Sequence, residues 1–168
     1  MAAPKKTTSK RLTNEEALND LYHTAQVLDE WPGENYNGTS VRAGAKALLS
    51  RGLLSEYVWG TTVAELRNFV LSRGTAVVGT DWYEEMFYPE QHGGYLVVQG
   101  AVVGGHAWLV IGYDAKKKAF IMLNSWGPEW GKAGTAYITE EEMQKLLDLN
   151  AEICSGIETR PAKPVAPV

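Results

Sequence analysis

Apolar residues in the first half of the chain recur every three or four positions, the period of an amphipathic helix. One helix is predicted from residue 13 to 28, where Thr13 and Glu16 have the spacing of a capping box. Its apolar face consists of Leu18, Leu21, Tyr22, Ala25 and Leu28. A second helix is predicted over residues 40–49 and a short third one over 62–74, each begun by a Ser or Thr cap.

After Gly74 the helical period gives way to short apolar runs bounded by turn residues, which predict strands. A last helix is predicted from residue 139 to 147. Helices followed by mostly antiparallel strands favour the α+β class, with a helical part and a β-rich part. The predicted strands cover residues 75–79, 95–98, 107–113, 120–123, 136–138 and 153–157.

The chain length of 168 residues fits one domain with flanking segments. We expect a basic, disordered leader at residues 1–11 and a domain at 12–158, with its helical part at 12–74 and its β-rich part at 75–158. A proline-rich tail is expected at residues 159–168. The leader is not a secretory signal, because no apolar stretch follows its basic residues.

Charge is unevenly distributed along the chain. Residues 1–11 carry four positive charges and residues 158–168 a net of one, so the whole-chain net of −4 leaves −9 on residues 12–157. An acidic body argues against a nucleic-acid surface on the fold itself. The leader either touches an acidic surface or a phosphate backbone, or is simply solvated. No apolar run has the length of a membrane span.

The candidate chemistry lies in two of the predicted strands. His106 begins the apolar run 107–113, and Asn124 ends the run 120–123. A turn at residues 114–118 would pair these runs antiparallel and bring His106 close to Asn124, with Trp126 covering the hydrogen bond between them. A lone pair of this kind equally describes a histidine that is satisfied in a core.

The residues around the pair favour a catalytic reading. Residues 105–114, GHAWLVIGYD, and 124–138, NSWGPEWGKAGTAYI, resemble the segments around the catalytic histidine and the orienting asparagine of papain-like cysteine peptidases. Residues 38–46 resemble a helix of bacterial and bacteriophage members, and 80–86 a segment of the right domain. DEWPG at 29–33 resembles a subgroup from phages of actinobacteria. The resemblance covers residues 12–158 and implies a papain-like fold, with an incomplete helical left domain.

The nucleophile that the resemblance implies is missing. The family carries its cysteine on an early helix, after a Gln of the oxyanion hole, and no cysteine precedes His106 here. The chain looks as though it begins just after that helix. The single cysteine, Cys154, matches a structural late-strand position and is not expected to be the nucleophile. One cysteine forms no internal disulfide, which favours a reducing compartment.

The other histidines are weaker candidates. His23 falls on the first predicted helix, and His92 in a loop that would border a substrate cleft; a structural role is favoured for both. The three histidines lie 69 and 14 positions apart, which is not a metal-ligand spacing, so neither metal nor cofactor is expected.

Two functions therefore remain open. The chain is either a cysteine peptidase domain that hydrolyses peptide bonds only when the missing cysteine helix is supplied, or a non-catalytic binding or structural protein, for instance in a phage particle. Expected partners are a peptide or protein ligand, and an upstream chain or a second copy over the helical side. The expected location is the cytoplasm of a bacterial host or the virion.

Overall fold

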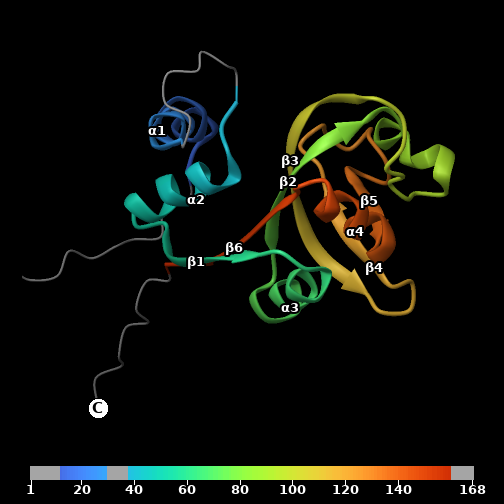
Figure 1. Cartoon of the computed structure of the whole chain (residues 1–168). Helices are drawn as coiled ribbons and strands as arrows, with labels where there is room; N and C mark the ends of the chain where they lie inside the picture. Colours follow the sequence, from blue (N-terminus) through green and yellow to red (C-terminus); the bar gives the residue numbers. More distant parts are fainter. Residues whose placement is uncertain (1–11, 30–37, 160–168) are drawn as a thin grey trace, which may run out of the picture. The chain divides into compact units, whose positions relative to one another are not determined.

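The computed structural model describes residues 12–29 and 38–159 (Figure 1). The predicted leader at 1–11 and residues 160–168 of the predicted proline-rich tail lie outside the described residues. The described residues fall into two compact units, the first within the ranges Met1–Tyr57 and Ile157–Val168, and the second within Val58–Gly156.

The first unit is built around a helix pair. Its first helix begins with the predicted capping box, in which Thr13 Oγ1 accepts from the Glu16 N–H at 3.1 Å. The helix consists of a π-helical stretch, η1 (Glu16–Leu21), followed by α1 (Tyr22–Leu28). The second helix, α2 (Val41–Ser50), is capped by Ser40 as predicted. The π-helical stretch is rare, and nothing in the hydrophobic pattern predicted it.

The helix pair buries smaller side chains than its apolar pattern predicted. Its core cluster consists of the buried Ala25, Ala43 and Ala47, with Leu21 packed against them. Leu18 of the predicted inner face is 67% exposed, because the π-helical stretch shifts the helical register away from 3.6 residues per turn. The pair therefore leaves part of its apolar surface in contact with solvent.

A buried carboxylate joins the two helices of this unit. Asp29, at the end of α1, accepts hydrogen bonds from Thr39 Oγ1 and from the backbone N–H and hydroxyl of Ser40, over 2.8–3.1 Å. The Ser40 hydroxyl also accepts from the Ala43 N–H and so caps α2. The same interactions satisfy a buried charge and a helix terminus.

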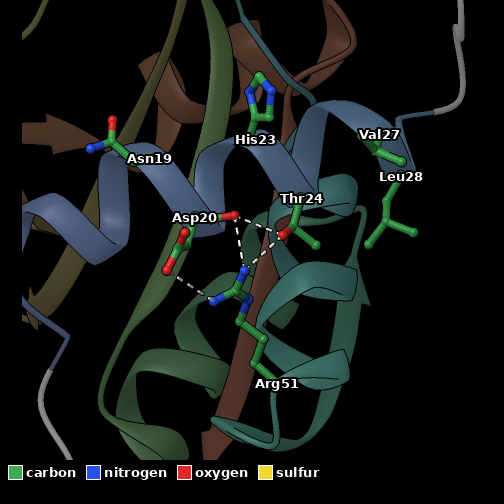
Figure 2. A pocket seen from close by; sticks show the side chains of 7 residues that line it. All are labelled: Asn19, Asp20, His23, Thr24, Val27, Leu28 and Arg51. Carbon is green, nitrogen blue, oxygen red and sulfur yellow. Dashed lines mark hydrogen bonds and ion pairs between the residues drawn. The ribbon is translucent and has the colours of Figure 1, made fainter.

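A hollow of about 370 Å³ lies on the same helix pair (Figure 2). Figure 2 shows Arg51, which directly follows α2, reaching towards the η1–α1 helix, where its Nη2 donates to the Asp20 carbonyl and to Thr24 Oγ1. Its Nη1 lies 3.8 Å from the Asp20 carboxylate. Because the guanidinium is engaged within the helix pair, we assign the hollow to helix packing.

A six-stranded sheet has the order β1-β6-β2-β3-β4-β5, and the α+β prediction is confirmed. The pairs β2–β6, β2–β3, β3–β4 and β4–β5 are antiparallel. The first strand was not predicted from the sequence, because its run LSEYVWG mixes polar and apolar residues without clear alternation. The strands are β1 (Leu54–Gly60), β2 (Ala76–Tyr83), β3 (Val102–Asp114), β4 (Ala119–Leu123), β5 (Thr135–Thr139) and β6 (Glu152–Glu158).

The core of the second unit lies between one face of the sheet and two helices. These helices are α3 (Val63–Arg73), which buries Leu66 and Val70, and α4 (Glu140–Asp148), which buries Met143 and Leu146. The sheet contributes fully buried residues such as Val78, Val110 and Met122. Because α3 packs on this core, it belongs to the strand-containing unit, whereas the sequence placed it in the helical part.

Polar contacts also connect the two helices of this unit to the sheet. The Glu140 carboxylate accepts from the Tyr113 hydroxyl of β3 at 2.7 Å and pairs with the Arg67 guanidinium of α3. The pKa of the Tyr113 hydroxyl is raised, mainly because its proton is held in the bond to Glu140. The Glu140 carboxylate at the start of α4 therefore contacts both β3 and α3.

The prediction of a strand over residues 95–98 is wrong. Only Tyr95 forms a bridge, to Tyr137 of β5, and Leu96 donates its N–H to the Tyr137 carbonyl. The Val98 N–H instead donates to the Glu142 carboxylate, which draws the chain away from the sheet. Two 3₁₀ turns precede this segment, η2 (Glu84–Phe87) and η3 (Pro89–His92), and the sequence had predicted neither.

A capping box begins α3, as the spacing of Thr62 and Glu65 predicted. We expect Thr62→Ala to lower the free energy of unfolding by about 0.5–2 kcal/mol, because the Glu65 N–H then loses its acceptor. Thr62→Ser, which keeps the hydroxyl, is the control and should unfold like the wild type. Urea unfolding monitored by circular dichroism measures the difference; equal stability of Thr62→Ala and wild type would contradict the cap.

The same cap gives a pH dependence. The pKa of the Glu65 carboxyl is lowered, first by the N–H of Thr61 and then by the Thr62 hydroxyl. A lowered pKa in the folded state adds stability above the unfolded-state pKa, and this stability is lost as the pH falls through the folded-state value. Wild type should therefore be more stable than Glu65→Gln near neutral pH, and the difference should close in acid. Glu141→Gln, which lacks such bonds, is the control; a pH-independent difference would contradict the prediction.

Candidate active site

The strand register brings two of the predicted residues to one edge of the core face. Leu109 of β3 pairs with Leu123 of β4, which places Trp108 opposite Asn124 and makes His106 its diagonal neighbour. His106 pairs with Thr80 of β2, on the same face as the buried Trp108. Asn124 continues the β4–β5 pairing by donating its N–H to the Gly134 carbonyl at 2.9 Å. Both side chains are thus positioned by backbone pairing.

The two side chains are in direct contact. His106 Nε2 lies 2.9 Å from Asn124 Oδ1, the hydrogen-bond reach that the hairpin predicted. Asn124 is 7% exposed, and His106 is half-buried. The bond is therefore largely protected from competing water, which strengthens it.

The orientation of the Asn124 amide defines the tautomer of the histidine. The Ser125 backbone N–H points at Asn124 Oδ1 from 2.8 Å, and a backbone N–H only donates, so this atom is the oxygen. A carbonyl oxygen only accepts, and His106 Nε2 must therefore carry a proton and donate. In the neutral ring Nδ1 is then the atom with a free lone pair. The arrangement leaves Nδ1 as the atom that takes up a proton.

Aromatic rings surround the imidazole. Trp126 stacks on His106 with centroids 4.8 Å apart and an interplanar angle of 26°, so it lies where the sequence predicted a cover. Trp82 of β2 meets His106 edge-on at 5.0 Å. Phe87 stacks on Trp126 at 5.3 Å, and Trp130 contacts Trp126 edge-on at 5.8 Å. These rings fix the imidazole plane and exclude water from the hydrogen bond.

The sequence pattern did not indicate Trp82, Phe87 or Trp130 as residues of the site. Trp82 is 2% exposed and lies on the His106 face of β2, two residues from Thr80. The alternation of buried residues along β2 was the signal that would have placed it. Phe87 lies in a 3₁₀ turn that no periodicity indicated.

Two buried donors at this site lack acceptors among the described residues. They are Asn124 Nδ2 and Trp82 Nε1. A buried N–H without a partner costs roughly 1–3 kcal/mol, so such groups are uncommon in native structures. Both donors belong to residues that contact His106, so the unmet hydrogen bonds are concentrated at this site.

Cys154 lies away from the imidazole. It pairs with Val77 of β2, three residues from the Thr80 that pairs with His106, and on the far side of β2 from β3. Three residues of about 3.3 Å and two strand spacings of about 4.8 Å separate the Cα atoms by roughly 14 Å. Odd and even positions of β2 face opposite sides of the sheet, so the two side chains point apart.

The other two histidines do not join the pair. His92 lies in η3 with its Nε2 3.0 Å from the Glu85 carboxylate, and His23 lies on α1 beside the hollow in Figure 2. Within residues 12–29 and 38–159, no group of His, Cys, Asp or Glu side chains has the arrangement of a metal site. In the same ranges, no helix is both long and apolar enough to span a bilayer.

A histidine held by an amide oxygen at one ring nitrogen, with a lone pair on the other, can take up and release a proton. The sequence profile described as papain family cysteine protease matches residues 34–157. The chain therefore belongs to the papain family of cysteine proteases.

Individual relatives match parts of the chain. Cathepsin B-like cysteine proteinase 5 of Caenorhabditis elegans is 32% identical over 80 residues, which are 46% of this chain and 23% of the relative. A cathepsin B-like cysteine proteinase of Schistosoma japonicum is 34% identical over 67 residues, 39% of this chain and 19% of the relative. The chain therefore matches only about a fifth to a quarter of the length of these curated relatives.

Solved structures share the fold at low identity. Xylellain, a cysteine protease from Xylella fastidiosa, aligns with a TM-score of 0.53 and 19% identity, over 74% of this chain and 47% of xylellain. The bromelain protease from Ananas comosus, solved with the E64 inhibitor, aligns with a TM-score of 0.53 and 17% identity, over 80% and 77% of the two chains. The papain-like fold is thereby confirmed.

Nitrogen NMR of the His106 ring tests the tautomer directly. We expect a proton on Nε2 and none on Nδ1 in the neutral form, because Asn124 Oδ1 accepts only. Asn124→Ala should give a mixture of tautomers. It should also lower the free energy of unfolding by about 1–3 kcal/mol, since the His106 and Ser125 donors lose their acceptor. Asn68→Ala, at an exposed position of α3, is the control. A proton on Nδ1 in the wild type would contradict the geometry.

Proposed function

We propose that this chain supplies the imidazole-and-amide half of a cysteine-peptidase site, which hydrolyses peptide bonds once a cysteine thiol is supplied. His106 moves the protons, Asn124 holds its ring, and Trp126 shields the bond between them. The observation that carries the proposal is the 2.9 Å contact of His106 Nε2 with an amide oxygen, which directs Nδ1 to the reaction. Family membership supports it.

The chemistry follows from the tautomer. His106 Nδ1 takes the proton of the thiol, and the thiolate attacks the peptide carbonyl carbon, whose π electrons move to oxygen. His106 then gives this proton to the amide nitrogen as the C–N bond breaks, which leaves a thioester. In the second half, Nδ1 takes a proton from water as the oxygen attacks the thioester. The C–S bond breaks, the acid leaves, and the proton returns to sulfur.

We infer that the nucleophile comes from a cysteine outside these 168 residues, on an upstream segment or on another chain. Cys154 is the sole cysteine of the chain, and it is 4% exposed on the opposite sheet face from His106. The two buried donors without acceptors, Asn124 Nδ2 and Trp82 Nε1, support a site completed by further residues. The resemblance to bacterial and phage members suggests a cysteine helix of that type.

The exposed apolar surface of the helix pair supports a covering partner. Leu18 and Val27 are 67% and 77% exposed, and Leu28 is 36% exposed. Covering a side chain of this size contributes roughly 1.5–3 kcal/mol. We therefore propose that the partner, either the cysteine-bearing segment or a second copy of the chain, contacts this surface.

A binding or structural protein on the papain-like fold, for instance a phage particle component, is the second candidate. The orientation of Cys154 away from His106 favours it, because the chain alone then has no nucleophile. The two candidates differ in one property, which is whether an added thiol restores turnover.

Hydrolysis of a panel of fluorogenic peptides under reducing conditions measures that property. The chain alone and its Cys154→Ala variant should both be inactive. A synthetic peptide with the cysteine helix of a papain-family relative should confer turnover, and His106→Ala should remove about 10²–10⁴-fold of it. Asn124→Ala should reduce the turnover that the cysteine peptide confers, while Asn68→Ala should leave this turnover unchanged.

Two outcomes would change the conclusion. Turnover by the chain alone that disappears in Cys154→Ala would make Cys154 the nucleophile. A cysteine peptide that binds the chain without conferring turnover would favour the binding or structural protein. Binding is measured separately by the fluorescence anisotropy of the labelled cysteine peptide.

A further inference from the structure

The two 3₁₀ turns near the site, η2 and η3, are connected by a side-chain hydrogen bond that takes no part in the His106–Asn124 pair. His92 Nε2 of η3 lies 3.0 Å from the Glu85 carboxylate of η2. An ionised carboxylate only accepts, so Nε2 carries a proton and donates in either charge state of the ring. The bond closes residues 85–92 into a small loop, which we call the 85–92 loop.

This loop has an exposed tip between two buried residues. Met86 and Pro89 are fully buried, whereas Phe87 and Tyr88 between them are 37% and 48% exposed. The start of the loop is anchored outside the turns, because the Glu85 N–H donates to the carbonyl of residue 99 at 3.2 Å. The core therefore fixes two positions of the loop and leaves the tip at the surface.

The tip connects the loop to the ring that covers the imidazole. Phe87 stacks on Trp126 with centroids 5.3 Å apart and an interplanar angle of 10°, and Trp126 in turn stacks on His106. The Phe87 carbonyl also accepts from Trp130 Nε1 at 3.1 Å. We call Phe87 and Trp126 the aromatic cover. A displacement of the tip would remove a contact from this cover, which protects the bond between His106 and Asn124 from water.

We propose that His92 and Glu85 are positioning residues of the site, whose bond holds Phe87 against Trp126 and keeps the aromatic cover closed. Among the described residues, this is the side-chain hydrogen bond that links η2 directly to η3. Both side chains are partly exposed, so the bond contributes modestly. Its loss is expected to loosen the surface tip, while the buried Met86 and Pro89 keep the core in place.

The inference concerns the aromatic cover and does not require turnover. It rests on the proposed function in one respect, which is the expectation that an open cover also slows hydrolysis after the cysteine peptide is added. Water that reaches the hydrogen bond of His106 competes with the Asn124 oxygen and weakens the orientation of the ring.

Hydrogen exchange of the Trp130 indole, followed by NMR in the chain without added cysteine, reports the position of Phe87, whose carbonyl accepts the indole proton. His92→Asn should accelerate this exchange about two- to fivefold, because the shorter amide does not reach Glu85. His92→Gln places an amide nitrogen near the position of Nε2 and should restore most of the protection. Exchange of the His106 Nε2 proton, compared at one fixed pH, should follow the same order.

Further variants separate the bond from a general loss of stability. Glu85→Ala should act like His92→Asn, and the double variant should exchange no faster than either single one, because both remove the same bond. His23→Asn, at an exposed histidine of α1, is the matched control with no expected effect. Amides of the buried strand β4 should exchange at the wild-type rate in every variant, since only the tip opens.

Several results would overturn the inference: unchanged exchange in His92→Asn, an acceleration that His92→Gln does not reduce, additive effects of His92→Asn and Glu85→Ala, or an equal acceleration of the β4 amides. The expected exchange rates without any turnover on adding the cysteine peptide would leave the positioning role in place and contradict the proposed function. Turnover by wild type and His92→Asn at the same rate, with the same exchange rates, would do the reverse.

Discussion

The hydrogen bond between His106 and Asn124 depends on the pairing of β3 with β4, and the remainder of the site depends on that bond. A shift of one residue would turn His106 to the opposite sheet face, where Leu109 and Ile111 are partly exposed. The register is held by the core on one face, through Trp108, Val110 and Met122. The packing of the second unit thus determines the chemistry available to the imidazole.

Around this bond, groups with hydrogen-bond partners lie next to buried donors that have none among the described residues. The amide oxygen of Asn124 accepts two hydrogen bonds, while its nitrogen and the Trp82 indole have no acceptor among the described residues. The stacked ring of Trp126 covers one side of the imidazole. In the proposed function His106 acts on a nucleophile, and the only cysteine of the sequence faces the other way.

The sequence predicted what depends on local spacing and strand pairing. The caps at Thr13, Ser40 and Thr62, the α+β class and the approach of His106 to Asn124 all followed from periodicity or from a short hairpin. What it missed depends on tertiary contacts. β1 lacks alternation, residues 95–98 are drawn from the sheet by Glu142, and Phe87 reaches the site through a 3₁₀ turn.

If His106 is a base ready for a thiol, a supplied cysteine should become more reactive when it binds to the chain. The rate at which iodoacetamide alkylates the cysteine-helix peptide is measured against pH, with wild-type chain and with His106→Ala. We expect wild type to make the thiol reactive well below its ordinary pKa of about 8.5, and His106→Ala to abolish this shift. Identical pH profiles with both proteins, under conditions where the peptide is bound, would contradict the account.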